Sequence, residues 1–212
     1  MGVLTKKEIL QRMEKGEIDF SPQIDTLQLQ PHSVDLRLGY TFLVYKRSQE
    51  TDDGRVAMNL GYESSDRHFD VVELEEGQYF EILPHEYVIV STLEKVKLPN
   101  DIMAVLFPRS SVNRRGLSVD LSGMIDAGYE GNLIIPLRNN TDSQVIRVYP
   151  GERFCQIIFH ELVSPVVPKK SRYNKKDIAV GVLNEAKSDE ERLIRKGKLK
   201  TLKEKYQIKI GQ

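Results

Sequence analysis

The sequence predicts an all-β fold, a sandwich or a barrel, with one helix before it and a helical extension after it. From Val34 onward, short runs rich in Val, Ile, Leu, Phe and Tyr are separated by Gly, Pro, Asn and Asp. Many short strands with turn residues between them are typical of these architectures. The pattern does not alternate between strand and helix, which disfavours a parallel α/β sheet. The predicted strands are VDLRLGYTFLVY, YFEIL, EYVIVSTL, IMAVLF, LSVDL, NLIIPL, QVIRVY and RFCQIIFHEL.

The N-terminus carries the signals of a helix. Thr5 and Glu8 have the spacing of a capping box. An apolar stripe follows at Ile9, Leu10 and Met13. The later stretch 47–68 is mostly polar, and we expect it to be a loop or a poorly ordered excursion.

One domain with a C-terminal appendage is expected. Residues 1–165 form the β domain with its N-terminal helix, and residues 166–212 form a basic tail that is helical from about residue 188. Ser188 and Glu191 have capping-box spacing, although Gly197 weakens the helix interior. The tail has a net charge of about +8, while the whole chain is neutral. It could pack on a neighbouring subunit, approach an anionic ligand or stay solvated.

Composition excludes several classes of function. The 212 residues contain one cysteine, Cys155, so an internal disulfide is excluded and a reducing cytoplasm is expected. No apolar run approaches the roughly 20 residues of a membrane span, and the N-terminus lacks a signal-peptide core. Because the overall charge is balanced, we expect neither a membrane nor a nucleic-acid partner. The four histidines are scattered and Cys-x-x-Cys is missing, which disfavours a zinc site.

Four polar clusters interrupt the apolar strands. Asp35 lies in an otherwise apolar strand, and Gln156 lies in another. Arg109, with the hydroxyls of Ser110 and Ser111, offers the donors that suit a phosphate group. The fourth cluster pairs Asp126 with Tyr129 in an apolar hairpin. Each cluster taken alone also has an ordinary explanation, as a turn, a surface pair or a solvent-facing strand residue.

The order and spacing of these clusters resemble the dUTPase/dCTP deaminase superfamily. PRSSVNRRGL resembles its second motif, GMIDAGYEGNL its third and GERFCQIIF its fourth. ILQRMEKGEIDFSP followed by LQPHSVDLRLG resembles the start of the dCTP deaminase branch. The resemblance covers residues 8 to about 165. It implies a distorted β-barrel or jelly roll that assembles as a homotrimer, with active sites between subunits.

The resemblance also implies a pyrimidine deoxynucleoside triphosphate as the substrate and Mg²⁺ held largely by its phosphates. Asp126 would then orient the catalytic water, and Tyr129 would pack on the deoxyribose and exclude a 2′-hydroxyl. The main chain near residues 120–125 would read the base, and Asp35 would support the site or the hydrated metal, indirectly through water. The expected phosphate ligands are Arg109, Ser110, Ser111 and Gln156, and Arg114 matches a deaminase-like position.

Pro136 occupies the position that distinguishes dCTP deaminases from dUTPases in this superfamily. The resemblance places a proton-shuttling glutamate of the deaminases at this position, and proline has no ionisable group. The leading expectation is therefore hydrolysis of dUTP to dUMP and pyrophosphate. The alternatives are dCTP deamination, with or without subsequent hydrolysis, and a non-catalytic nucleotide-binding or regulatory protein. Asp120 leaves a cytosine nucleotide as a further possible substrate, because its carboxylate could accept a hydrogen bond from the N4 amino group of cytosine.

Proline cannot complete a strand ladder, so Pro136 also predicts an edge position or a bulge. A second departure from the superfamily concerns the tail, in which the glycine-rich phosphate-covering segment is not recognisable. A basic lid made of Lys169, Lys170, Arg172, Lys175 and Lys176 could replace it.

Overall fold

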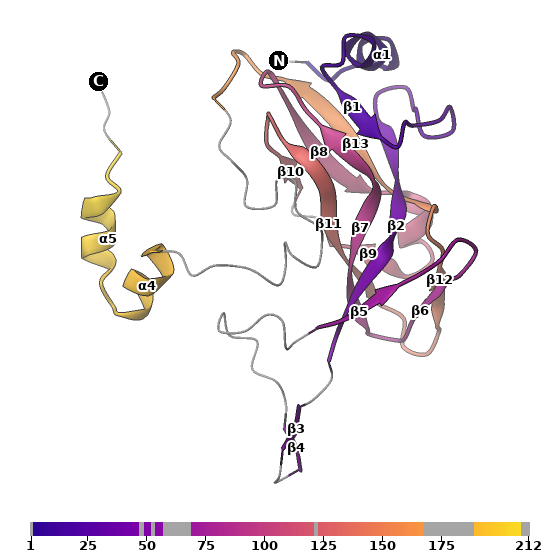
Figure 1. Cartoon of the computed structure of the whole chain (residues 1–212), viewed down its shortest axis with the longest axis vertical. Helices are drawn as coiled ribbons and strands as arrows, with labels where there is room; N and C mark the ends of the chain where they lie inside the picture. Colours follow the sequence, from indigo (N-terminus) through magenta and orange to yellow (C-terminus); the bar gives the residue numbers. More distant parts are fainter. Residues whose placement is uncertain are drawn as a thin grey trace.

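A computed structural model describes residues 2–46, 49–51, 54–56, 69–120, 123–167 and 189–208. It consists mostly of a curled antiparallel sheet that forms a half-barrel, which confirms the predicted all-β fold (Figure 1). The strands are β1 (Asp19–Ser21), β2 (Val34–Tyr45), β3 (Gln49–Thr51), β4 (Gly54–Val56), β5 (Phe69–Glu73), β6 (Phe80–Ile82), β7 (Tyr87–Lys97), β8 (Ile102–Pro108), β9 (Leu117–Val119), β10 (Met124–Ile125), β11 (Glu130–Asn139), β12 (Ile146–Val148) and β13 (Arg153–Glu161). The helices are α1 (Lys6–Glu14), α2 (Ser110–Asn113), α4 (Asp189–Arg195) and α5 (Leu199–Lys205).

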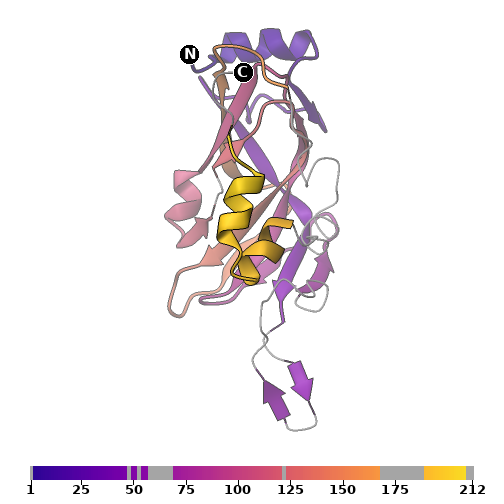
Figure 2. The same cartoon turned by 90° about the vertical axis from the view of Figure 1, so that its left-hand side faces the viewer.

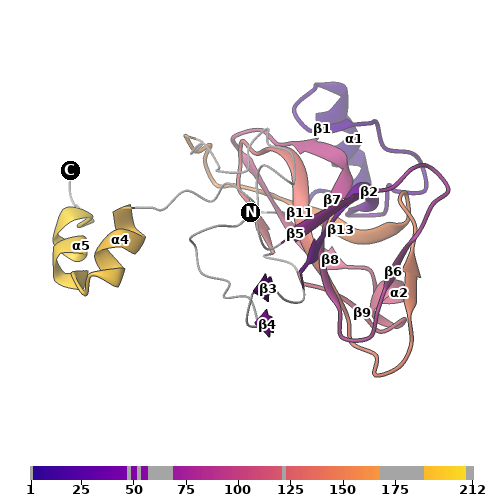
Figure 3. The same ribbon diagram turned by 60° about the horizontal axis from the view of Figure 1, so that its bottom comes forward.

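The main sheet has the strand order β10-β8-β13-β2-β7-β11-β9, with β1 added to β7 and β5 added to β2. Its curl around the core is seen in Figure 3. Strands β6 and β12 form a separate pair, as do β3 and β4. The β3–β4 pair lies inside the stretch expected to be a loop. That expectation was wrong for residues 49–51 and 54–56, because a main-chain ladder forms without an apolar face to signal it.

Alternation along the strands builds the core. In β11, Leu133, Ile135 and Leu137 point inward, while the residues between them are half-exposed. Aromatic pairs fill the interior: Phe42 stacks on Phe80 with ring centroids 4.8 Å apart, and Phe20 meets Phe159 edge-on at 6.3 Å. The apolar–polar period of two, visible in the sequence, thus sets which face of each strand is buried.

Helix α1 begins as the capping box predicts, since the main-chain N–H of Thr5 donates to the Glu8 carboxylate at 2.7 Å. Ile9 is fully buried and Met13 packs against the core. Leu10, expected in the same stripe, is instead exposed, because one helical step turns it away from the sheet.

The C-terminal extension is helical, as expected, and consists of two short helices rather than one. Gly197 separates α4 from α5 with a positive φ of 67°, a conformation that glycine adopts without strain. The Asp189 carboxylate accepts from Arg192, Lys205 and the Tyr206 hydroxyl. These contacts hold together α4 and α5, whose ribbons face the viewer in Figure 2. Ser188 and the five basic residues of the expected lid lie outside the described residues. Within the described part of the chain, no helix is long and apolar enough to cross a membrane.

Candidate active site

A pocket of about 400 Å³ opens beside the start of α2. Its walls come from the loop before β2, from β2 itself, from the β8–α2 connection and from β13, so residues far apart in the sequence meet there. Six of the residues expected in the site line it together. The complete lining is Gln30, Pro31, His32, Ser33, Asp35, Arg109, Ser110, Ser111, Arg114 and Gln156.

The β8–α2 connection presents Arg109 and the two serines. Strand β8 ends at Pro108, and Arg109 has an extended main chain that precedes the single turn of α2. Its carbonyl accepts from the N–H groups of Val112 at 2.9 Å and Asn113 at 3.2 Å. The buried Val112 anchors this turn to the core, which leaves Ser110 and Ser111 exposed at the pocket.

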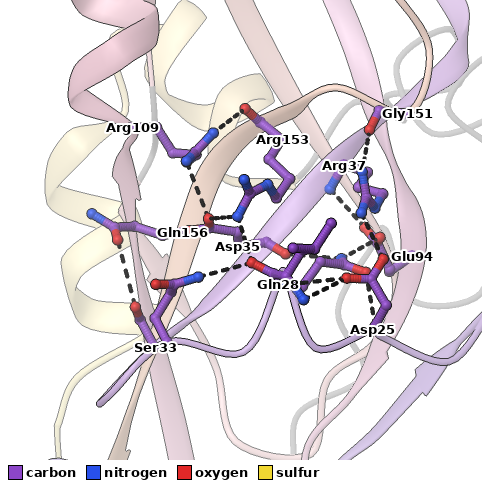
Figure 4. A network of polar contacts seen from close by, with 12 residues as sticks. Asp25, Gln28, Ser33, Asp35, Arg37, Glu94, Arg109, Gly151, Arg153 and Gln156 are labelled. Atoms are coloured by element: carbon purple, nitrogen blue, oxygen red, sulfur yellow. Dashed lines mark hydrogen bonds and ion pairs between the residues drawn. The ribbon is translucent and has the colours of Figure 1, made fainter.

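The charged centre of the pocket wall is Asp35, whose side chain is only 3% exposed. Its Oδ2 lies 3.1 Å from Nε of Arg109 and 3.1 Å from Nη1 of Arg153 (Figure 4). Arg109 also donates through Nη1 to the carbonyl of Arg153 at 3.1 Å. One buried carboxylate therefore holds two guanidinium groups at the pocket.

Burial raises the pKa of Asp35, and the positive charges of Arg109 and Arg153 oppose that shift. Two charge-assisted contacts at hydrogen-bond distance favour the ionised carboxylate near neutral pH. The structure thus places Asp35 against two guanidinium groups at the pocket, and its role in a site, like its link to a hydrated metal, stays a prediction.

Gln156 reaches the same pocket from β13, where it is paired in register with Asp35 of β2. The Ser33 hydroxyl donates to its Oε1 at 3.5 Å, which orients the amide. An amide NH₂ group is a suitable donor for a phosphate oxygen. The pocket thus combines guanidinium, hydroxyl and amide donors.

Asp126 and Tyr129 form a second group in the turn between β10 and β11. Asp126 is exposed, and its carbonyl accepts from the Tyr129 N–H at 3.2 Å. Gly128 completes the turn with a φ of 78°. The Tyr129 hydroxyl donates to the carbonyl of Asn132 at 2.7 Å, and burial raises the pKa of Tyr129 to about 12. The phenol is therefore neutral at physiological pH.

The two groups lie at opposite ends of β8. Asp126 directly follows Ile125, which pairs with Ala104 near the beginning of β8. Arg109 directly follows the end of that strand. At about 3.3 Å per residue, the five steps from Ala104 to Arg109 span roughly 17 Å. One chain by itself therefore does not bring Asp126 to the expected phosphate ligands.

Asp120 and Pro136 are neighbours at the end of β9. The N–H of Asp120 donates to the carbonyl of Pro136 at 2.9 Å. Pro136 pairs with Ile89 of β7 on one side, while β9 ends on its other side at Val119. The expected edge position is wrong for the strand, because β11 lies between β7 and β9 in the sheet; Pro136 instead follows the last ladder pair with β9, Leu137 and Val119. The bulge of β11 falls earlier, between Asn132 and Ile134, rather than at the proline.

The side chain of Pro136 is half-exposed on the outer face of β11. Along the strand it shares this face with Ile134, and the partner strand β7 places Ile89 and Tyr87 there. These neighbours are apolar or phenolic. A carboxylate in place of Pro136 would lie on this outer face. Of the expected base-reading segment, residues 121 and 122 lie outside the described residues.

Sequence reasoning missed Arg153, whose guanidinium contacts the Asp35 carboxylate and whose carbonyl accepts from Arg109. Its signal was a charged residue at the start of the apolar run RFCQIIF. Cys155 is fully buried, in agreement with a structural role. Among the described residues, no group of three or more His, Cys, Asp or Glu side chains could hold a metal ion.

Comparison with known proteins identifies the family. A family model described as dCTP deaminase-like matches residues 3–162. The chain belongs to the dCTP deaminase-like family. A curated relative from Sulfurihydrogenibium sp. (strain YO3AOP1), named dCTP deaminase, dUMP-forming, is 38% identical over 160 residues, which cover 76% of this chain and 84% of the relative. One from Dictyoglomus thermophilum with the same name is 37% identical over 165 residues, covering 77% and 82%.

Solved structures agree with this membership in the dCTP deaminase-like family. The dCTP deaminase of Agrobacterium tumefaciens superposes with a TM-score of 0.58 at 27% identity, over 74% of this chain and 46% of that one. The names of these relatives agree better with the alternative of dCTP deamination than with the leading expectation of dUTP hydrolysis alone. The chain is therefore a member of an enzyme family in which relatives are named for acting on dCTP.

Proposed function

We propose that this dCTP deaminase-like protein forms dUMP from a pyrimidine deoxynucleoside triphosphate. The observation that carries the proposal is the pocket in which Arg109, Ser110 and Gln156 converge beside a buried aspartate. Planar guanidinium groups and hydroxyls match the oxygens of a triphosphate in geometry and charge. The relatives named dUMP-forming support the same product.

Two substrates are compatible with this product. The names of the relatives favour dCTP, which must be both deaminated and hydrolysed. Pro136 favours dUTP, which needs hydrolysis only, because no proton can be exchanged at that side chain. Both routes share the hydrolytic step, so the phosphate pocket and Asp126 serve either one.

In the hydrolytic step, Asp126 orients a water molecule that attacks the α-phosphorus. A new bond forms between the water oxygen and phosphorus, the bond to the α–β bridging oxygen breaks, and pyrophosphate leaves. The proton of the water passes through the Asp126 carboxylate to solvent. Arg109 and the other donors neutralise charge on the leaving pyrophosphate, and positioning supplies most of the remaining acceleration. The Tyr129 ring packs on the deoxyribose.

A second copy of the chain completes the site in this proposal. Asp126 and Arg109 lie at opposite ends of β8, so the hairpin of one copy must meet the phosphate pocket of another. A closed ring of three copies, the homotrimer expected from the family resemblance, would repeat this contact three times.

Mg²⁺ fits the proposal as an ion that arrives with the nucleotide. Asp35, the carboxylate among the pocket residues, is already paired with two guanidinium groups, and the described residues form no metal cage. Mg²⁺ prefers to keep several waters and to bind through substrate phosphates. Bound in that way, it would offset the negative charge of the triphosphate.

The test is incubation of the purified protein with dCTP, dUTP and UTP in the presence of Mg²⁺, with products separated by chromatography. Formation of dUMP that is lost in Asp126→Asn supports the proposal. dUMP from dCTP assigns the bifunctional route, and dUMP from dUTP alone assigns the hydrolase. Release of dCMP would instead indicate hydrolysis without deamination. Absence of turnover would contradict the proposal and favour a nucleotide-binding protein.

A further inference from the structure

A carboxylate that the proposed chemistry does not use lies behind the phosphate pocket. Glu94 is on the core-facing side of β7 and is 1% exposed. Its Oε1 accepts from Nε2 of Gln28 at 2.7 Å, and its Oε2 accepts from the main-chain N–H of Arg37 at 2.9 Å. Burial raises the pKa of Glu94, while these hydrogen bonds oppose the shift.

Gln28 joins Glu94 to the main chain of the pocket wall. It is 2% exposed, and its Nε2 also donates to the carbonyl of Asp35 at 2.9 Å. Its own carbonyl accepts from the Asp35 N–H at 2.8 Å. Asp35 is therefore held by Gln28 at both its N–H and its C=O group, in addition to its side-chain contacts (Figure 4).

The loop that contains Gln28 also anchors the second guanidinium. Nη1 of Arg153 donates to the carbonyl of Leu27 as well as to the Asp35 carboxylate. Movement of this loop would therefore displace Asp35 together with Arg153, one of the two partners of its side chain. The contacts thus run without a gap from Glu94, through the loop and Asp35, to Arg109 at the pocket.

We propose that Gln28 and Glu94 are positioning residues that fix the direction of the Arg109 guanidinium through Asp35 and Arg153. This inference rests on the proposed function of the pocket as a triphosphate site. A well-packed apolar pair of similar volume is often at least as stable as buried polar and charged partners. Simple packing between β7 and the loop would therefore not require these two residues, whereas alignment of the charged donor does.

The experiment measures binding of inorganic tripolyphosphate with Mg²⁺ by calorimetry, since this probe contacts the phosphate pocket without a base or sugar. The variants Gln28→Met and Glu94→Gln both nearly keep the side-chain volume. Gln28→Met removes the amide donations to Glu94 and to the Asp35 carbonyl, and Glu94→Gln removes the charge and replaces one of the two acceptor oxygens by an NH₂ group. Loss of alignment of one charge-assisted contact predicts affinity about tenfold weaker in each variant. The same variants should raise KM for the nucleotide about tenfold and change kcat less than threefold.

Thr92→Val is the matched control. Thr92 is on the same strand and 1% exposed, and its hydroxyl donates to the Glu94 carbonyl and accepts from the Leu133 N–H. The first contact lies within β7 and the second joins β7 to β11, so neither reaches the pocket. We expect this variant to lower the melting temperature as the other two do, and to leave tripolyphosphate affinity within twofold of the wild type.

Three results would overturn the inference. Binding by Gln28→Met and Glu94→Gln at wild-type affinity would show that the pocket needs no such support. Equal weakening in all three variants would show general loss of stability instead of positioning. If the wild type and Arg109→Ala bind tripolyphosphate equally, the phosphate pocket itself is wrong. That last result contradicts the proposed function, whereas the first two contradict only the positioning role.

Discussion

Nε of Arg109 lies 3.1 Å from Oδ2 of Asp35, although the two residues belong to segments on either side of β13. Arg153, at the start of β13, contacts the same carboxylate oxygen at 3.1 Å. Three strands thereby converge on one buried charge. An unpaired guanidinium in the pocket would rotate freely, and the shared carboxylate removes much of that freedom before a ligand arrives.

Replacing Asp35 with Asn should therefore weaken both stability and phosphate binding. Breaking a buried ion pair costs about 3–5 kcal/mol. We expect about 2 kcal/mol here, because the Arg109 and Arg153 side chains remain 27% and 26% exposed. Urea unfolding measures the loss. Arg115→Gln, which removes the exposed pair with Glu152, is the control and should cost about 0.5 kcal/mol.

Pro136→Glu should introduce or accelerate deamination of dCTP. The side chain at this position is half-exposed on the outer face of β11, so a carboxylate can be accommodated there. The family resemblance places the proton-shuttling glutamate of the deaminases at this position. A positioned general acid–base group contributes about 10²–10⁴-fold. Chromatography of dCTP incubations measures uracil nucleotides, with Pro136→Gln as the control. A wild type that already deaminates as fast as the glutamate variant would show that another acid carries the proton.

Mixing two inactive variants tests whether the site is shared between copies. Asp126→Asn removes the water-orienting group, and Arg109→Ala removes a phosphate ligand. If hairpin and pocket come from different copies, an equal mixture of exchanged subunits should recover about one quarter of wild-type activity, since that fraction of sites combines two intact halves. No recovery after demonstrated subunit exchange would place both groups in one chain's site.

The pH dependence of stability should reveal the buried Glu94. Burial raises its pKa above the usual 4.5, so the folded state keeps this proton to higher pH than the unfolded state does. The contribution of Glu94 to the free energy of unfolding is therefore largest below about pH 4.5 and falls as pH rises toward the folded pKa. Urea unfolding of wild type and Glu94→Gln between pH 5 and 8 measures this.

The expected sign follows from the proton count. The free energy of unfolding of the wild type minus that of Glu94→Gln should decrease with pH, by at most about 1.4 kcal/mol per pH unit. Other carboxylates cancel in this difference. A difference that stays constant or increases with pH would mean that the pKa of Glu94 is not raised by burial.

Local patterns in the sequence determined much of this protein. The capping box of Thr5 and Glu8 places the start of α1, and the period of two in β11 decides which residues enter the core. Gly197 was identified as a weak point of the C-terminal helix, and the chain turns there. The residues of the phosphate pocket were identified by family resemblance, and the structure brings them together. These features depend on residues a few positions apart in the sequence, or on motifs made of consecutive residues.

Only the tertiary structure decided how the clusters relate to one another. Asp35 meets Arg153 across 118 positions, and Gln28 meets Glu94 across 66, so neither pairing leaves a local pattern. The sheet order places Asp126 and Arg109 at opposite ends of β8, although both belong to one predicted site. The physical reason is that strand pairing joins distant segments in a register that depends on the whole core. The sequence states which side chains can ionise or form hydrogen bonds, and the fold determines which of them become partners.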